Sequence, residues 1–204
     1  MIMDLPLAEK KWSLQEILWQ ASAYDPGWKP QEKPDRVELT PWDLQHLLVD
    51  YLLGGLLFHK PKPQEEEPEK ALIDHLGTSL SRTLDLFAPL AGRLDTIEHE
   101  DKTTLLFFID CNNTGALFVH AVAEKVTISD IIEPVYVPAI FYSFFQLDEV
   151  KNIDCTSKPL LAVQITELVD GIFIVCTINH SAVGGDSFWH FFNSWSEISR
   201  GSGF

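Results

Sequence analysis

The chain has 204 residues, of which 46% are hydrophobic, a proportion that allows a packed core and excludes a generally disordered protein. Its 30 acidic and 15 basic side chains give a net charge of −15, which repels polyphosphate and argues against nucleic-acid binding. The same charge offers no general attraction for a phosphorylated ligand, so a phosphate site would need a local basic patch.

The chain contains three cysteines, Cys111, Cys155 and Cys176, which are far apart and form no Cys-x-x-Cys pair. This spacing does not match a zinc site, and an odd, sparse set of thiols suits a reducing compartment. Residues 1–11 lack the apolar stretch of a signal peptide, and no apolar run approaches the roughly 20 residues that span a bilayer. We therefore expect a cytoplasmic protein that binds neither a membrane nor a metal.

The first part of the chain combines a helical pattern with a loop. Residues 12–21 carry apolar side chains at helical spacing, and we expect a short amphipathic helix that begins after Ser13. The proline- and glycine-rich residues 24–34 indicate a loop.

A helix is expected to begin with Thr40 as its cap and Pro41 as its first residue, a well-matched pair for a helix start. Apolar side chains at helical spacing, among them Tyr51, extend this helix to Leu52. A Gly-Gly pair then ends it before a strand at residues 56–58. From spacing alone, Tyr51 is most simply an aromatic side chain of the core.

The middle of the chain alternates between helical and strand patterns. A charged, proline-rich linker at residues 60–70 leads into a helix of about four turns that starts at Ala71 and closes at Pro89. Strands are expected at residues 36–39, from residue 92, and at 105–110, 116–123, 159–168 and 171–178, with a short helix at 129–132. Turn-forming residues 111–115 predict one hairpin, and an Asp-Gly pair predicts another between the last two strands. This mixture predicts an α+β fold.

The stretch from residue 172 to residue 201 organises the rest of the chain. A β-rich apolar run ends at Asn179-His180, and an aromatic stripe at helical spacing begins after Asp186. Asp186 or Ser187 is suited to cap this new helix, because a short oxygen side chain satisfies N–H groups of the first turn. His180 is therefore predicted at a sharp turn from a buried strand into a helix, where a fixed imidazole suits acid–base chemistry.

Three segments of the sequence resemble the plant BAHD acyl-CoA-dependent acyltransferases. Asn-His-Ser-Ala-Val-Gly-Gly-Asp-Ser-Phe-Trp-His-Phe-Phe, from Asn179, is similar to their active-site segment, whose motif is His-x-x-x-Asp-Gly. Leu-Thr-Pro-Trp-Asp-Leu, from Leu39, resembles the family's first helix. Phe-Ala-Pro-Leu-Ala-Gly-Arg-Leu, from Phe87, resembles the signature Tyr-Pro-Leu-Ala-Gly-Arg-Leu. The segments occur in the family's order and the resemblance covers residues 37–201.

The resemblance implies the chloramphenicol-acetyltransferase-like fold, an α+β domain with a mixed β-sheet flanked by helices. It assigns residues 37–204 to the N-terminal acyltransferase-like domain and leaves residues 1–36 as an atypical N-terminal segment. Family members carry a second domain with the signature Asp-Phe-Gly-Trp-Gly, which this sequence lacks. The resemblance is therefore to the N-terminal half only, and the second domain is expected to be absent.

The resemblance also implies a reaction. In the family, the motif histidine is the general base that takes a proton from the acceptor as it attacks the thioester of acyl-CoA. This implies His180 as the base, acyl-CoA as a co-substrate rather than a bound cofactor, and a hydroxyl or amine of a small plant metabolite as the acceptor. Tyr51 becomes a candidate substrate-binding residue, because the family's first helix and next strand meet near the mouth of the acceptor site.

This sequence departs from the family's motif at one position. The motif aspartate, which in relatives is mainly structural, falls on Gly184 here. Asp186, two residues later, is a candidate catalytic residue that either substitutes for it or caps the helix. Arg93, in the second signature, is expected to be structural and to bridge a carboxylate. His180, Asp186 and His190 have a spacing that matches no common zinc site, so no metal is expected.

Two functions remain open at this point. The first is an acyl-CoA-dependent acyltransferase with His180 as its base. The second is a non-catalytic truncated remnant or interaction protein of the same family, which Gly184 and the missing second signature favour. A half-enzyme would expose the apolar face that normally meets its partner domain, and we expect self-association through that face.

Overall fold

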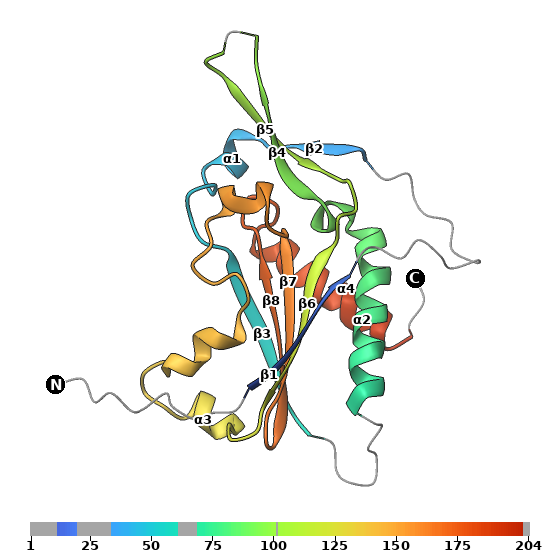
Figure 1. Cartoon of the computed structure of the whole chain (residues 1–204), viewed down its shortest axis with the longest axis vertical. Helices are drawn as coiled ribbons and strands as arrows, with labels where there is room; N and C mark the ends of the chain where they lie inside the picture. The colour runs from blue at the N-terminus through green and yellow to red at the C-terminus, as the bar shows by residue number, and fades with distance from the viewer. Residues whose placement is uncertain (1–11, 20–33, 61–68, 101, 202–204) are drawn as a thin grey trace, which may run out of the picture.

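The computed structural model describes residues 12–19, 34–60, 69–100 and 102–201. Within this part of the chain, the strands form two sheets, and two long helices cover one face of the larger sheet (Figure 1). This arrangement confirms the predicted α+β class, with a mixed sheet flanked by helices. None of the described helices is long and apolar enough to cross a membrane.

The larger sheet has five strands. They are β1 (Trp12–Trp19), β3 (Leu52–His59), β6 (Ala116–Ala123), β7 (Leu161–Glu167) and β8 (Gly171–Ile178). Their order is β1-β6-β7-β8-β3, in which β6 and β7 run parallel and the other neighbours run antiparallel. β7 lies at the centre and is buried along its whole length, as expected for a strand that is covered on both faces.

The hairpin predicted from the Asp-Gly pair joins β7 to β8. The N–H of Leu168 donates a hydrogen bond of 2.8 Å to the carbonyl oxygen of Gly171 and closes the turn. Because β8 ends at Ile178, it carries the chain directly to His180.

The smaller sheet contains β2 (Arg36–Glu38), β4 (Arg93–Glu98) and β5 (Leu105–Asp110), in the order β2-β5-β4. The hairpin of β4 and β5 extends away from the rest of the molecule in Figure 1. The predicted hairpin between β5 and β6 is wrong, because β6 pairs instead with β1 and β7. The residues between β5 and β6 cross from the smaller sheet to the larger one. The N–H of Gly115 donates a hydrogen bond to the carbonyl oxygen of Ala91 at 2.8 Å and holds this crossing segment in place.

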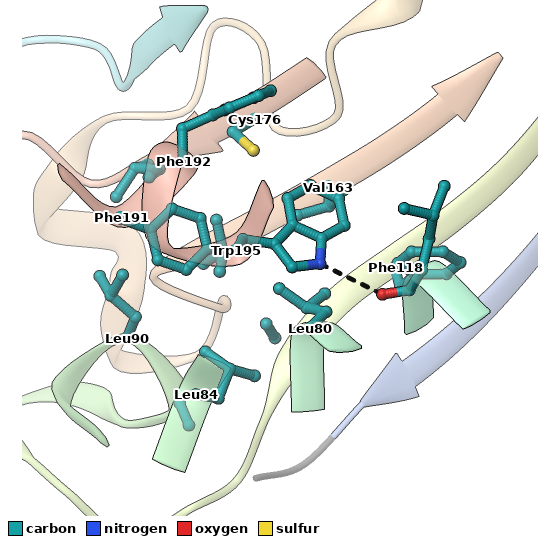
Figure 2. Close-up of a cluster of buried hydrophobic side chains, with 14 of the residues drawn as sticks. Leu80, Leu84, Leu90, Phe118, Val163, Cys176, Phe191, Phe192 and Trp195 are labelled. Atoms are coloured by element: carbon teal, nitrogen blue, oxygen red, sulfur yellow. Dashed lines mark hydrogen bonds between the residues drawn. The ribbon is translucent and has the colours of Figure 1, made fainter. Parts of the chain in front are cut away.

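The long helices α2 (Glu69–Leu86) and α4 (Gly185–Ser199) confirm the two predicted apolar stripes and pack on the same face of the larger sheet (Figure 1). Figure 2 shows the buried cluster that they form with the strands. The indole N–H of Trp195 donates to the hydroxyl of Ser79 at 2.9 Å and to the carbonyl oxygen of Leu76 at 3.3 Å, so this ring also ties the two helices together. The fully buried members of the cluster include Leu80, Leu84, Phe118, Val163, Cys176 and Phe191.

The opposite face of the sheet carries a second buried cluster. Here α3 (Ile128–Ile132), close to the predicted short helix, starts at Thr127, whose side chain accepts the N–H of Asp130 at 3.2 Å. The short 3-10 helix η2 (Ala139–Phe144) follows it. The cluster includes Val126, Ile131, Phe144, Phe145, Phe173 and Val175.

The helix α1 (Pro41–Leu44) begins as predicted, because Thr40 is its cap and the carboxylate of Asp43 accepts the N–H of Thr40 at 2.7 Å. It ends much earlier than expected. Tyr51 and Leu52 are not helical, and Leu52 already belongs to β3.

The Gly54-Gly55 pair lies inside β3 and does not end a helix. A Cβ atom at Gly54 would lie 2.6 Å from the ring of Phe188, and one at Gly55 would lie 2.6 Å from the carbonyl oxygen of Ile174. The absence of side chains therefore lets β3 approach both α4 and β8 closely.

The helix predicted at residues 12–21 is wrong within the described residues. Residues 12–19 form β1, which pairs antiparallel with β6 from Trp12 opposite Ala123 to Trp19 opposite Ala116. The backbone of this segment forms its hydrogen bonds with the edge of the sheet at β6. The spacing of apolar side chains within the segment does not show that such a sheet edge is available.

Candidate functional site

His180 lies in the turn between β8 and α4, at the junction where the sequence predicts it, and its side chain is partly exposed. Its ring nitrogen Nδ1 lies 3.1 Å from the carbonyl oxygen of Val183. Because a carbonyl oxygen can only accept a hydrogen bond, this contact places the ring hydrogen on Nδ1 and leaves Nε2 with its lone pair.

Asn179 shapes the turn that carries His180. Its Oδ1 accepts the N–H of Ser181 at 2.8 Å, and its carbonyl oxygen accepts the N–H of Ala182 at 3.1 Å. Its Nδ2 donates to the carbonyl oxygen of Asn152 at 2.8 Å. A buried amide with these partners holds the backbone in one conformation, since each lost bond would leave a buried polar group unpaired.

Two residues that the sequence analysis missed lie against His180. Asn152 is the first residue of η3 (Asn152–Thr156) and is fully buried. Its Oδ1 accepts the backbone N–H of His180 at 2.8 Å, and its Nδ2 donates to the carbonyl oxygen of His46 at 2.8 Å. The imidazole of His46 stacks on that of His180, with ring centroids 4.1 Å apart and planes 5° from parallel. These residues come from three separate segments, and no spacing in the sequence signals their meeting.

Tyr51 lies behind this turn, in a third buried cluster with Leu47, Leu94 and Leu160. Its hydroxyl donates to the carbonyl oxygen of Pro159 at 2.9 Å and contacts the sulfur of Cys155. Burial raises the pKa of the Tyr51 hydroxyl and also that of the Cys155 thiol. Tyr51 therefore supports the turn from the core, as its spacing indicates, and its role in substrate binding stays a prediction.

The predicted cap of α4 is wrong, because the cap residue is Gly184 rather than Asp186 or Ser187. The backbone of Gly184 is extended, with φ −89° and ψ 178°, which is the conformation that a cap residue requires. Asp186 lies exposed in the first turn, where the helix dipole favours a negative charge. Its catalytic role stays a prediction.

Two other residues named from the sequence lie apart from this turn. Arg93 donates to the carbonyl oxygens of Gly92 at 2.7 Å and Gly115 at 2.8 Å, in place of the expected carboxylate, and burial lowers its pKa. His190 is exposed on α4, with its ring edge-on to Phe87. In the described part of the chain, no three His, Cys, Asp or Glu side chains gather in a way that would hold a metal ion.

Known proteins resemble this chain in sequence. A family model described as Transferase family matches residues 28–203. An uncharacterised acetyltransferase of Arabidopsis thaliana is 46% identical over 169 residues, a match that covers 82% of this chain and 37% of that protein. BAHD acyltransferase DCR of the same plant is 32% identical over 180 residues, which cover 85% of this chain and 36% of that protein. The chain thus spans little more than a third of the length of these relatives.

Solved structures resemble the chain in fold. Vinorine synthase matches with a TM-score of 0.69 and 24% identity, over 94% of this chain and 43% of that one. TRI101 of F. graminearum, complexed with ethyl coenzyme A, matches with a TM-score of 0.63 and 14% identity, over 83% of this chain and 40% of that one. These matches confirm the predicted acyltransferase fold.

Proposed function

The chain belongs to the Transferase family of BAHD acyltransferases, and on this premise we propose that it takes part in acyl transfer from acyl-CoA to a hydroxyl or amine of a small plant metabolite. In this proposal, residues 37–204 act as the acyltransferase domain and His180 is its general base. Residues 1–36 receive no catalytic role.

The geometry of the His180 imidazole is the observation that supports the proposal most. The ring is partly exposed, so a substrate can reach it, and its contact with the Val183 carbonyl at 3.1 Å leaves Nε2 as the basic nitrogen. The lone pair of Nε2 is thus free to take a proton from an acceptor that reaches the ring.

The proposed reaction has two steps. The Nε2 atom of His180 takes the proton from the acceptor O–H or N–H while the acceptor atom attacks the thioester carbonyl carbon. The tetrahedral adduct then breaks its C–S bond and releases the acylated product, and the proton passes from His180 to the CoA thiolate. General-base catalysis of this kind typically contributes about 10²–10⁴-fold to a rate.

Acyl-CoA enters this proposal as a co-substrate, and a structure of similar fold with ethyl coenzyme A supports that choice. The reaction needs no bound cofactor. A cytoplasmic location belongs to the same proposal, and the thiols of Cys111, Cys155 and Cys176, which are all free, support it.

The test is to follow thiol release from several acyl-CoA thioesters against a panel of alcohols and amines. We expect His180→Ala to lower the rate by at least about 100-fold, because the general base is removed. The control is His190→Ala, which deletes an exposed imidazole on α4. Equal rates for the wild type and His180→Ala would rule out His180 as the base.

Gly184 favours a second candidate function, that of a non-catalytic interaction protein, because the family's motif carboxylate is missing there. An exposed apolar edge also supports this alternative. β3 lies at an edge of the larger sheet, next to β8. Three apolar side chains along it are exposed: Leu53 by 39%, Leu56 by 39% and Phe58 by 47%. Beside it, a cavity of about 220 Å³ opens between β3 and α4. Such an edge favours pairing with a second copy.

Sedimentation velocity over a range of protein concentrations tests this alternative. We expect concentration-dependent dimers that Phe58→Lys weakens, whereas Ile132→Lys, a change at a 64% exposed apolar residue on α3, leaves them intact. A monomer at all concentrations that binds no hydrophobic dye would count against self-association.

A further inference from the structure

We propose that His46 is a positioning residue that holds the His180 imidazole in one orientation and one tautomer. This inference rests on the proposed function, in which His180 is the general base. His46 reaches His180 from the turn after α1, so it belongs to neither of the elements that carry the base.

The stacking of the two rings supports this role. Their centroids lie 4.1 Å apart and their planes differ by 5°, so the face of His46 covers one face of His180. Rotation of the His180 ring about its Cβ–Cγ bond would drive its edge into the His46 ring, because 4.1 Å is already close to van der Waals contact. The stack therefore restricts the ring to the plane in which Nδ1 faces the carbonyl oxygen of Val183.

Asn152 fixes the distance between the two histidines. Its side chain is fully buried, accepts the His180 N–H at 2.8 Å and donates to the His46 carbonyl at 2.8 Å. Its own carbonyl oxygen accepts from Asn179 at 2.8 Å. A buried amide that is bonded on both sides sets the spacing of the segments that it joins. The ring stack is thus supported by the backbone of both histidines rather than by side-chain contact alone.

This arrangement has a consequence for catalysis. A base that is held in one orientation meets the acceptor proton in productive geometry, whereas a freely rotating ring spends part of its time pointing elsewhere. The stack does not involve the Nε2 lone pair, so it leaves that atom available. We expect loss of the stack to lower kcat about 10–100-fold with little change in KM, because binding does not depend on the rotation of this ring.

The first test does not require activity. Long-range proton–nitrogen NMR of the full chain, labelled with nitrogen-15, distinguishes the two imidazole tautomers, and the spectrum of His180→Ala identifies the signals of His180. We expect one tautomer with hydrogen on Nδ1 in the wild type. His46→Ala should give an averaged spectrum of both tautomers, and His46→Phe, which keeps a flat ring, should retain the single tautomer. Circular dichroism confirms that each variant is folded.

The second test compares kcat and KM of the same variants. We expect kcat to fall in His46→Ala and to be largely restored in His46→Phe. If the wild type shows no turnover with any thioester, the proposed function fails and the NMR experiment still decides the role of His46. The inference is overturned if His46→Ala keeps the wild-type tautomer of His180, or if His46→Phe loses it as completely as His46→Ala does.

Discussion

Gly184 separates His180 from α4, and its surroundings are open. A Cβ atom built on Gly184 would meet no atom within 4 Å, and its backbone is extended, so a side chain is sterically allowed there. A carboxylate side chain would therefore have space at this position. The position serves in this chain as a helix cap without a capping side chain.

We predict that Gly184→Asp stabilises the protein by a few tenths of a kcal/mol, because the new carboxylate can accept N–H groups of the first turn of α4. Gly184→Ala should destabilise it, since alanine is a poor cap residue. Urea unfolding at about 0.15 M salt, which screens repulsion from the nearby Asp186, measures both variants. The prediction fails if the aspartate is no more stable than the alanine.

For single residues, the sequence predicts the position of the candidate base, His180, but not the residues that surround it. His180 follows an apolar run and precedes a helical stripe, and such local patterns are visible in a sequence. His46 and Asn152 are neither near His180 in the chain nor part of a motif. Their meeting depends on how α1 and η3 pack against the end of β8, which no local pattern contains.

At the scale of single elements, β3 shows how a local signal can be interpreted wrongly. Gly54-Gly55 is typical of a helix end, yet the pair lies within a strand because β8 and Phe188 leave no space for side chains. Tyr51 and Leu52 continue the helical spacing of apolar residues, but Leu52 pairs with Ile178 of β8 and is therefore part of a strand. Long elements with many apolar residues, such as α2 and α4, were predicted correctly, since their own side chains determine the face they bury.

We predict that Gly55→Ala destabilises the protein by about 1–3 kcal/mol, because the added Cβ would lie 2.6 Å from the carbonyl oxygen of Ile174 and force the two strands apart. The matched control is Gly185→Ala in the first turn of α4, where a Cβ meets nothing within 4 Å and reduced freedom of the unfolded chain favours folding. Urea midpoints of the two variants give the comparison. Equal midpoints would show that β3 does not need this close approach.

At the scale of the whole molecule, burial of weak acids makes stability depend on alkaline pH. Cys176 is fully buried, and burial raises the pKa of its thiol well above the ordinary value of 9.0. Burial raises the pKa of Cys155 and Tyr51 in the same direction. Above about pH 9 the unfolded chain releases these protons and the folded chain keeps them, so the unfolded state binds fewer protons and gains relative stability.

We predict that ionisation of these buried groups does not change the free energy of unfolding below pH 8, and that it lowers the free energy of unfolding as the pH rises above about 9. The contribution of Cys176 alone should steepen through this range and approach about 1.4 kcal/mol per pH unit at pH values well above the pKa of the unfolded thiol. Urea unfolding from pH 8 to 10.5 measures the slope, and Cys176→Ala should make it shallower even though the variant is less stable at pH 8. An unchanged slope would mean that another group controls the alkaline transition.

The order of strands in the larger sheet has a consequence for biosynthesis. Among the described strands, β3 pairs with β8 alone, from Leu52 opposite Ile178 to His59 opposite Gly171. Its partner is therefore among the last described residues to leave the ribosome. Until then the nascent chain carries an apolar strand without its partner, and closing so long a loop is entropically costly. We therefore expect chaperones to bind Leu52–His59 during translation. Ribosome-bound chains arrested before Gly171 should bind such chaperones more strongly than chains released after Gly201.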